Sequence, residues 1–154
     1  MAVRAVSHVA IGVRDVDRAL EFYRDFLGPR VSADRIEEFP QGHGQPPARR
    51  RGVYLRWVDG PHATYIVLDQ QLTNETVGAP ARLFQAGIHH FAFWVDDLDA
   101  MLARARDAGF EVAMGAGGPA VDAEWSGEPR GSGLVRSVVL RDPEGNHVQL
   151  DQRV

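Results

Sequence analysis

Apolar and polar residues alternate along two stretches of the chain, residues 3–13 and residues 88–95. A period of two is typical of a β-strand that buries one face. Directly after each stretch, residues 17–27 and residues 98–108 carry apolar side chains at helical spacing. The pattern therefore predicts a strand followed by a helix at the start of each half of the chain.

Both predicted helices carry signals at their ends. Asp15 and Asp97 stand just before the helical pattern, where a carboxylate can accept hydrogen bonds from the unpaired N–H groups of the first turn. Gly28 and Gly109 follow the last helical residues, and glycine commonly ends a helix in a left-handed conformation. We therefore expect an N-cap and a terminating glycine in each half.

Each half continues with three further strand patterns. They lie at residues 30–37, 52–58 and 63–69, and at residues 111–114, 134–140 and 147–152. Three segments look like loops, namely residues 40–49, 73–85 and 115–133. The last of them contains Trp125, which either packs against the protein or covers a ligand. Both halves thus read strand, helix, strand, strand, strand.

The two halves also share residues at a constant offset of 82. Between residues 8–25 and residues 90–107, eight of the eighteen positions are identical, against about one expected by chance. The same offset brings residues 68–70 onto residues 150–152, both Leu-Asp-Gln. We therefore expect one α+β domain over residues 1–154. Its parts are a first module at 3–71, a linker at 72–87 and a second module at 88–154.

Strand alternation assigns side chains to faces. On the two first strands, His8 and His90 share a mixed face, while the opposite face is wholly apolar and should meet the helix. If the two sheets curl around a shared cavity, these two histidines face each other across it. On the last strand, His147, Gln149 and Asp151 form a polar face that points the same way.

The other histidines and a basic run are read as structural or solvent-exposed. His89 falls on the opposite face from His90, and His43 and His62 lie in loops. The run Arg49–Arg51 follows two prolines and is read as a solvated loop.

The amino-acid composition excludes several kinds of site and of protein. The chain has 154 residues, no cysteine, six histidines and a net charge of −4. The missing cysteines exclude a disulfide framework, a thiolate zinc site and a cysteine nucleophile. The net charge argues against binding of nucleic acid. No apolar run approaches the ~20 residues of a membrane helix, and the N-terminus has no signal-peptide pattern, so a soluble cytoplasmic protein is expected.

Several of these motifs are similar to those of a known family. They are His8-Val9-Ala10-Ile11, Asp15-Val16-Asp17, Phe22-Tyr23, His90-Phe91-Ala92-Phe93, Asp97-Leu98-Asp99, and the run of residues 140–150 that contains Asp142-Pro143-Glu144-Gly145-Asn146. The sequence resembles the vicinal oxygen chelate superfamily. That superfamily includes glyoxalase I, bleomycin- and fosfomycin-resistance proteins, methylmalonyl-CoA epimerase and extradiol dioxygenases. The resemblance implies paired βαβββ modules around a divalent metal, and a homodimer.

The resemblance also implies a ligand set, which this chain fills incompletely. The four ligand positions of metal-binding members correspond to His8, Val67, His90 and Gln149. Val67 cannot bind a metal, and Gln149 stands where many members have glutamate. Asp151 or His147 could complete the set instead. The missing glutamate also removes the base of the isomerase members, so glyoxalase I activity is disfavoured.

Two hypotheses follow. In the first, His8, His90 and Gln149 hold Fe²⁺, Mn²⁺, Zn²⁺ or Ni²⁺ in an enzyme acting on a small oxygenated molecule, by dioxygenation, by epimerisation or elimination, or by epoxide opening. Its further candidates are Tyr65 and His147 as acid or base, and Arg136 as an anion contact. In the second, a metal-free protein binds or sequesters a flat ligand against tryptophan rings. The rings are those of Trp57, Trp94 and Trp125.

Overall fold

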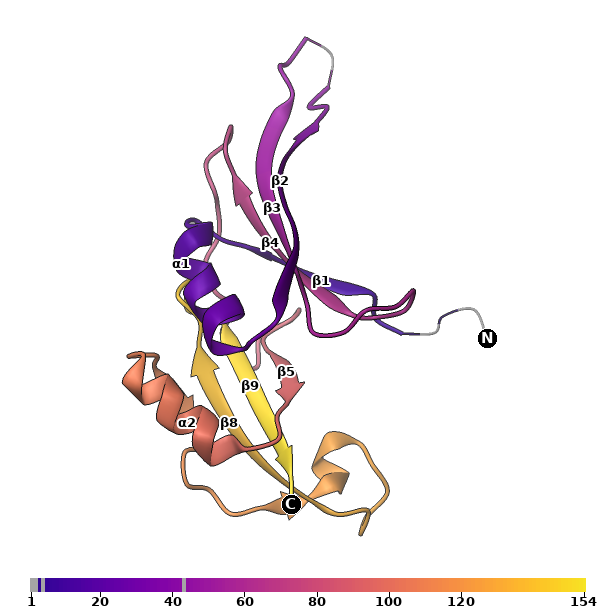
Figure 1. The fold of residues 1–154 in the computed structure, drawn as a ribbon, viewed down its shortest axis with the longest axis vertical. Coiled ribbons are helices and arrows are strands. Elements are labelled where there is room, and N and C mark those ends of the chain that lie inside the picture. The colour runs from indigo at the N-terminus through magenta and orange to yellow at the C-terminus, as the bar shows by residue number, and fades with distance from the viewer. Residues whose placement is uncertain (1–2, 4, 43) are drawn as a thin grey trace. The chain divides into compact units, whose positions relative to one another are not determined.

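A computed structural model describes residues 3, 5–42 and 44–154, and the chain divides into two compact units, Met1–Gly78 and Ala79–Val154 (Figure 1). His43 lies outside the described residues. No helix within these described ranges has the length and apolar character needed to cross a membrane.

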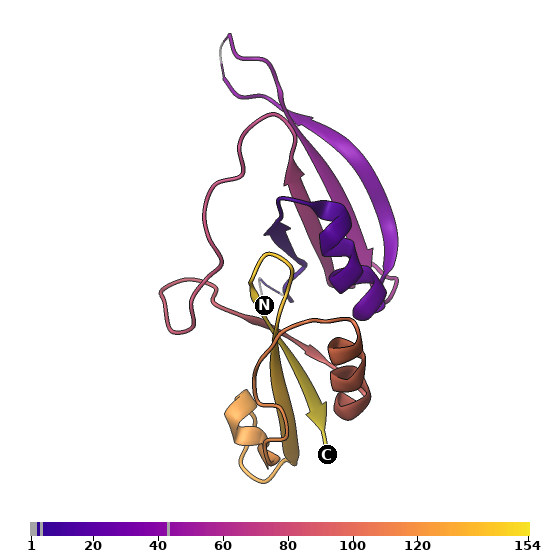
Figure 2. The same ribbon diagram turned by 90° about the vertical axis from the view of Figure 1, so that its left-hand side faces the viewer.

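The first unit is a four-stranded sheet with a helical segment on one face (Figure 2). Its elements are β1 (His8–Gly12), α1 (Val16–Leu20), η1 (Glu21–Phe26), β2 (Arg30–Phe39), β3 (Ala48–Arg56) and β4 (Tyr65–Gln71). The strand order is β1-β4-β3-β2. β1 and β4 are parallel, and the other pairs are antiparallel.

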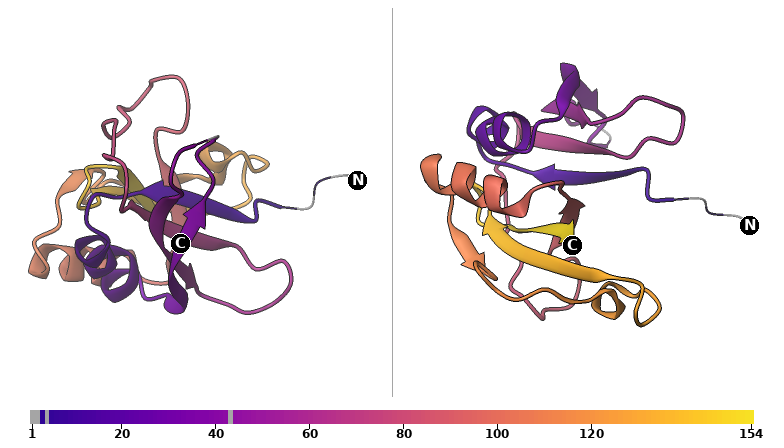
Figure 3. Two further views of the ribbon diagram at one scale, coloured as in Figure 1. Left: turned by 90° about the horizontal axis from the view of Figure 1, so that it is seen from above. Right: turned by 60° about the horizontal axis from the view of Figure 1, so that its bottom comes forward.

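The second unit repeats this plan, with α2 against one side of its sheet (Figure 3). Its elements are β5 (Phe91–Trp94), α2 (Leu98–Asp107), β6 (Val112–Met114), β7 (Val121–Asp122), η2 (Ala123–Ser126), β8 (Leu134–Arg141) and β9 (His147–Arg153). The order is β5-β9-β8-β6, with β7 paired to β8. The α+β class and the repeated strand-helix-strand-strand-strand plan are therefore confirmed.

The strand registers carry the same offset of 82 as the sequence. Ala10 pairs with Val67 in the first unit, and Ala92 pairs with Gln149 in the second. These are equivalent positions in the two modules. The internal repeat is therefore a structural repeat down to the register of the parallel strands.

A pair of equivalent glutamines explains part of the repeated Leu-Asp-Gln motif. Gln70 accepts a hydrogen bond from Val16 N at 3.3 Å and donates one to Arg14 O at 3.0 Å. Gln152 does the same with Leu98 N, at 3.1 Å, and Asp96 O, at 2.9 Å. Each glutamine thus ties the start of a helix to the strand beneath it.

The predicted helix ends are also confirmed. Asp15 accepts from Asp17 N and Arg18 N, and Asp97 accepts from Ala100 N. Gly28 and Gly109 have φ values of +86° and +75°, a region in which a side chain would be strained. Because these four residues fix where each helix begins and ends, the position of the helix could be predicted in both units.

Other expectations need correction. The predicted helix over 17–27 is α for its first turn only and then widens to a π-helix, η1, in which Leu27 N donates to Phe22 O. The first strands are shorter than predicted, because β1 and β5 begin only at His8 and Phe91. The predicted loop 115–133 contains a short strand, β7, and a 3₁₀ turn, η2.

The basic run is a further correction, since Arg49–Arg51 belong to β3 rather than to a solvated loop. Arg50 is ion-paired with Glu37 and Asp69. Arg51 is ion-paired with Asp17 and Asp34. The local pattern is misleading here because acidic partners on β2, β4 and α1 make a strand of consecutive arginines stable, and those partners are distant in sequence.

Candidate functional site

Three side chains stand in a row across the first sheet. His8 on β1 and Arg56 on β3 are both register partners of Tyr65 on β4. The imidazole of His8 stacks on the Tyr65 ring, with centroids 4.9 Å apart and planes 16° apart. The guanidinium carbon of Arg56 lies 4.1 Å from the centroid of the same ring. We call these residues the His8–Tyr65–Arg56 row.

The row lies on the face of the sheet away from the helix. Residues of the opposite parity on β4 include buried Leu68 and the helix anchor Gln70, so the helix covers their side. His8 Nδ1 is 2.8 Å from Ser7 Oγ, which fixes the imidazole ring. Among the described residues, His8 Nε2 and the Tyr65 hydroxyl have no hydrogen-bond partner. The row therefore presents polar atoms that a ligand could contact.

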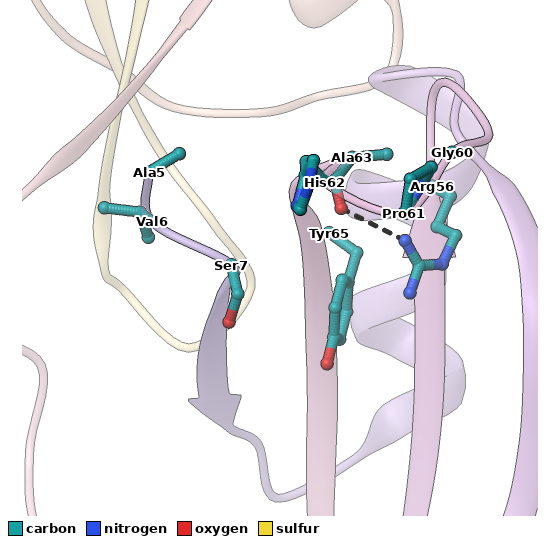
Figure 4. Close-up of a pocket in the computed structure, with 9 residues that line it drawn as sticks. All are labelled: Ala5, Val6, Ser7, Arg56, Gly60, Pro61, His62, Ala63 and Tyr65. Atoms are coloured by element: carbon teal, nitrogen blue, oxygen red, sulfur yellow. Dashed lines mark hydrogen bonds between the residues drawn. The ribbon is translucent and has the colours of Figure 1, made fainter. Parts of the chain in front are cut away.

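A pocket of about 320 Å³ opens beside the row (Figure 4). It is lined by residues 5–7 before β1 and residues 60–63 between β3 and β4, together with Arg56 and Tyr65. Figure 4 shows the Arg56 side chain fixed by a hydrogen bond from Nη1 to Ala63 O, 3.1 Å long. The volume is at the lower end of the range for small-molecule sites. His62, predicted to be a surface residue, is exposed and lines this pocket.

Further along the same face is a charged cluster centred on Glu37. Arg35 Nε donates to Glu37 Oε1 at 2.7 Å, and Tyr54 Oη donates to the same oxygen at 2.8 Å. Arg50 donates to Glu37 Oε2 through Nε and Nη2, at 2.9 and 2.8 Å, and also pairs with Asp69. These hydrogen bonds, first that from Arg35 and then those from Arg50 and Tyr54, lower the pKa of Glu37 to about 2.

This pKa predicts how stability depends on pH. Glu37 has a folded pKa of about 2, below its usual 4.5, so its contribution is present above pH 4.5 and is lost as pH falls toward 2. We expect Glu37→Gln to be less stable than the wild type at pH 7, with the difference shrinking between pH 4.5 and 2. Urea unfolding at several pH values measures this. The exposed Glu38→Gln is the matched control, and an unchanged difference at low pH would contradict the assignment.

In the second unit, the predicted polar face of β9 is held by hydrogen bonds within the sheet. Gln149 Nε2 donates to Asp151 Oδ1 at 2.8 Å, and Ser137 Oγ donates to the same oxygen at 2.5 Å. Asp151 is buried. The amide nitrogen of Gln149 is thus used by the protein, and its carbonyl oxygen is the atom left for a metal or ligand.

His147 and Trp94 share that face but have different surroundings. His147 is buried, and its Nδ1 has no hydrogen-bond partner among the described residues. Trp94 is exposed, with the guanidinium carbon of Arg153 at 5.2 Å from its ring. An exposed indole with a cation beside it is a surface on which a flat ligand could stack.

His89 and His90 do not point to opposite faces, contrary to the prediction. Their rings are adjacent, with centroids 4.6 Å apart and Nδ1 atoms 2.8 Å apart. Alternation misplaces His89 because both residues precede β5, which begins at Phe91. Strand parity applies only within a strand.

Three candidate ligand contacts are not grouped with the polar faces. Arg136 forms a two-pronged ion pair with Asp99 of α2, at 2.7 and 2.9 Å, and so lies on the helix side of its sheet. Trp125, on η2, is 85% exposed. Trp57 donates from Nε1 to Leu27 O at 3.3 Å. Within each unit, the structure groups none of these three residues with the predicted ligands.

The donor set bears on whether a metal fits. Val67, at the implied ligand position of the first unit, is an apolar side chain only 4% exposed. No group of three His, Asp or Glu side chains that could hold a metal occurs in the part of the chain that the structure describes. Of the implied ligands, His8 and His90 each have Nδ1 near a local partner, which leaves Nε2 as the atom that could bind a metal. Because Val67 is apolar and Gln149 is not a carboxylate, the residues supply an incomplete set of metal ligands.

Arg56, Ser7 and the Glu37 cluster were missed by sequence reasoning. Alternation in β3 could have placed Arg50, Tyr54 and Arg56 on one face. The contact between Arg56 and Tyr65 depends on the register between β3 and β4. The eight-residue connection between these strands (57–64) does not determine that register.

Comparison with known proteins gives a consistent family. At 32% identity over 152 residues, with 96% of each chain covered, the protein is similar to an ethylmalonyl-CoA/methylmalonyl-CoA epimerase of Cereibacter sphaeroides. At 27% identity over 154 residues, with 97% of this chain and 98% of the relative covered, it is similar to the uncharacterized protein YwbC of Bacillus subtilis.

Solved structures support the fold. A glyoxalase family protein from Bacillus cereus matches 100% of this chain and 99% of its own, with a TM-score of 0.73 and 20% identity. An antibiotic binding protein, TnmS3, from Streptomyces sp. CB03234 has the same coverage, with a TM-score of 0.58 and 23% identity. The family model described as "Glyoxalase/Bleomycin resistance protein/Dioxygenase superfamily" matches residues 7–126. The chain therefore belongs to the glyoxalase/bleomycin resistance protein/dioxygenase superfamily, that is, the vicinal oxygen chelate superfamily.

Proposed function

We propose that the protein binds a small, flat organic molecule on the face of its first sheet that lies away from the helix, without requiring a metal. The observation that carries this proposal is the His8–Tyr65–Arg56 row. In it, His8 stacks on a phenol ring and is fixed by Ser7. The row provides planar surfaces and polar edges beside a pocket of ligand size. Such a site needs no ion to be assembled, because every member is already fixed by its neighbours.

The donor set supports the same proposal. Val67 offers no ligand atom, and the amide nitrogen of Gln149 is bonded to Asp151. A facial site of two imidazoles and one carboxylate gains much of its affinity from the carboxylate charge, and here that charge is missing. The protein would then act by binding or sequestration.

A second candidate is a metal-dependent enzyme acting on a small oxygenated molecule. It is favoured by the 32% identity to an epimerase over 96% of both chains, and by the retained pair His8 and His90. A divalent ion held by these residues and the Gln149 carbonyl would polarise an oxygen of the substrate. Tyr65 and His147 would be the acid or base.

One titration separates the two candidates. Protein purified without a nickel column is titrated with a panel of planar aromatic compounds, and tryptophan fluorescence and heat are followed. The titration is done in EDTA and again after loading with Fe²⁺, Mn²⁺ or Zn²⁺. The proposal predicts the same affinity in both conditions. It also predicts a loss of about fivefold or more in Tyr65→Ala, since aromatic contacts of this kind contribute about 1 kcal/mol.

The outcomes are distinct. Ile36→Ala, an exposed apolar change on β2 at the parity opposite to Glu37, is the matched control and should bind normally. Binding that appears only after metal loading would favour the enzyme. A panel without any response in either condition would contradict both candidates.

A further inference from the structure

We propose that the pocket beside Arg56 is an anion subsite, and that it takes the carboxylate or phosphate oxygens of the ligand. This inference rests on the proposed binding function and names the charge of the molecule bound. Its starting point is the arginine charges of the first unit.

Most arginines of this unit have an acidic partner. Arg24, Arg30, Arg35, Arg49, Arg50 and Arg51 each form an ion pair with Asp or Glu. Arg18 has no such partner in the described residues but is exposed on α1, where water solvates it. Arg56 is different, because it is half-buried and no carboxylate among the described residues lies within ion-pair distance.

The guanidinium of Arg56 is nonetheless held in one orientation. Its carbon lies 4.1 Å from the Tyr65 ring centroid, and its Nη1 donates to Ala63 O at 3.1 Å. These contacts use the face of the group and part of its five N–H donors. The remaining donors are fixed in place before any ligand arrives, so little entropy is lost when an oxyanion binds to them.

The residues that line the pocket also favour an anion. None of the lining residues is acidic, and besides Arg56 they include Ser7, His62 and Tyr65 as polar side chains (Figure 4). A half-buried cation without a counter-charge is costly, and a bound carboxylate or phosphate would offset that cost through charge-assisted hydrogen bonds. At about 320 Å³, the pocket limits the ligand to a small acid or to the acidic end of a larger one.

Matched acidic and neutral probes provide the test. Benzoate and phenyl phosphate are compared with neutral benzamide by calorimetry. NMR shifts of the Ser7, Gly60, His62 and Ala63 amides report where each probe binds. We expect the acids to bind at least about tenfold more tightly than benzamide, and to shift these amides. The tighter of the two acids identifies the oxyanion.

Variants isolate the role of the charge. Arg56→Gln should weaken benzoate at least about tenfold more than it weakens benzamide, so that the preference for acids is lost. Arg56→Lys keeps the cation and should retain a preference for acids. Arg18→Gln makes the same charge change on an exposed helix residue and should change neither. The amide spectrum of Arg56→Gln verifies that the β3–β4 connection still folds.

The failures of the two proposals can be told apart. If benzoate and benzamide bind equally well, or if Arg56→Gln weakens both alike, the anion subsite is overturned while the binding function stands. If the acids bind more tightly but shift only amides of the second unit, the subsite is likewise overturned. If none of the three probes binds, the proposed function loses its support as well.

Discussion

Leu150→Ala is expected to lower the free energy of unfolding by about 2–5 kcal/mol. Leu150 is fully buried on β9, between its register partners Phe93 on β5 and Val138 on β8. Truncation removes the transfer free energy of the lost carbons and leaves a cavity, because strands fixed on both sides cannot close around it. Urea or thermal unfolding monitored by circular dichroism measures the loss.

Because the two modules repeat, a similar loss of stability is expected at the equivalent position of the first module. Leu68 is the equivalent residue of β4, is also fully buried, and lies between Ile11 and Val53. Leu68→Ala should therefore show a loss within the same range. Leu134→Ala, on an exposed part of β8, is the control and should cost less than about 1 kcal/mol. A Leu150→Ala protein as stable as this control would mean that the buried face has been assigned wrongly.

The regular elements could be predicted because their signals are local. Asp15 and Asp97 mark the helix starts through bonds to residues two or three positions on. Parity places Leu150 on the face opposite His147, Gln149 and Asp151, where it is fully buried. The offset of 82 gave the equivalence of Val67 and Gln149, which the strand registers confirm. All of this depends on neighbours within a few residues or on comparison of the chain with itself.

The site was harder to predict because its contacts are not local. Arg50 belongs to a strand rather than a loop because Glu37 and Asp69 neutralise it, and they lie 13 and 19 residues away. Arg56 contacts Tyr65 because of the register between β3 and β4. The length of the connection between these strands does not predict that register. The hydrogen bond from Gln149 to Asp151 is the exception, because the two residues are two positions apart and share the predicted polar face of β9.

Gln149→Glu is expected to destabilise the second unit by about 1–3 kcal/mol at pH 7. The amide nitrogen of Gln149 donates to Asp151 Oδ1 at 2.8 Å, and Asp151 is buried. Glutamate has no donor there and would place a second negative charge beside the first. Two carboxylates this close raise each other's pKa in the folded state above the unfolded values of about 4. The loss is therefore largest above the raised pKa and shrinks as pH falls through it.

A compensating change shows whether the hydrogen bond is the cause. In Gln149→Glu with Asp151→Asn, the donor and acceptor exchange places. With its NH₂ at the position of Asp151 Oδ1, the asparagine can donate one hydrogen to the introduced carboxylate and the other to Ser137 Oγ, which lies 2.5 Å from that position and would then accept. The double variant should recover most of the stability that the single one loses, and its stability should depend less on pH, because it has no pair of neighbouring carboxylates. If it is no more stable than Gln149→Glu alone, loss of the Gln149–Asp151 hydrogen bond is not the cause of the destabilisation.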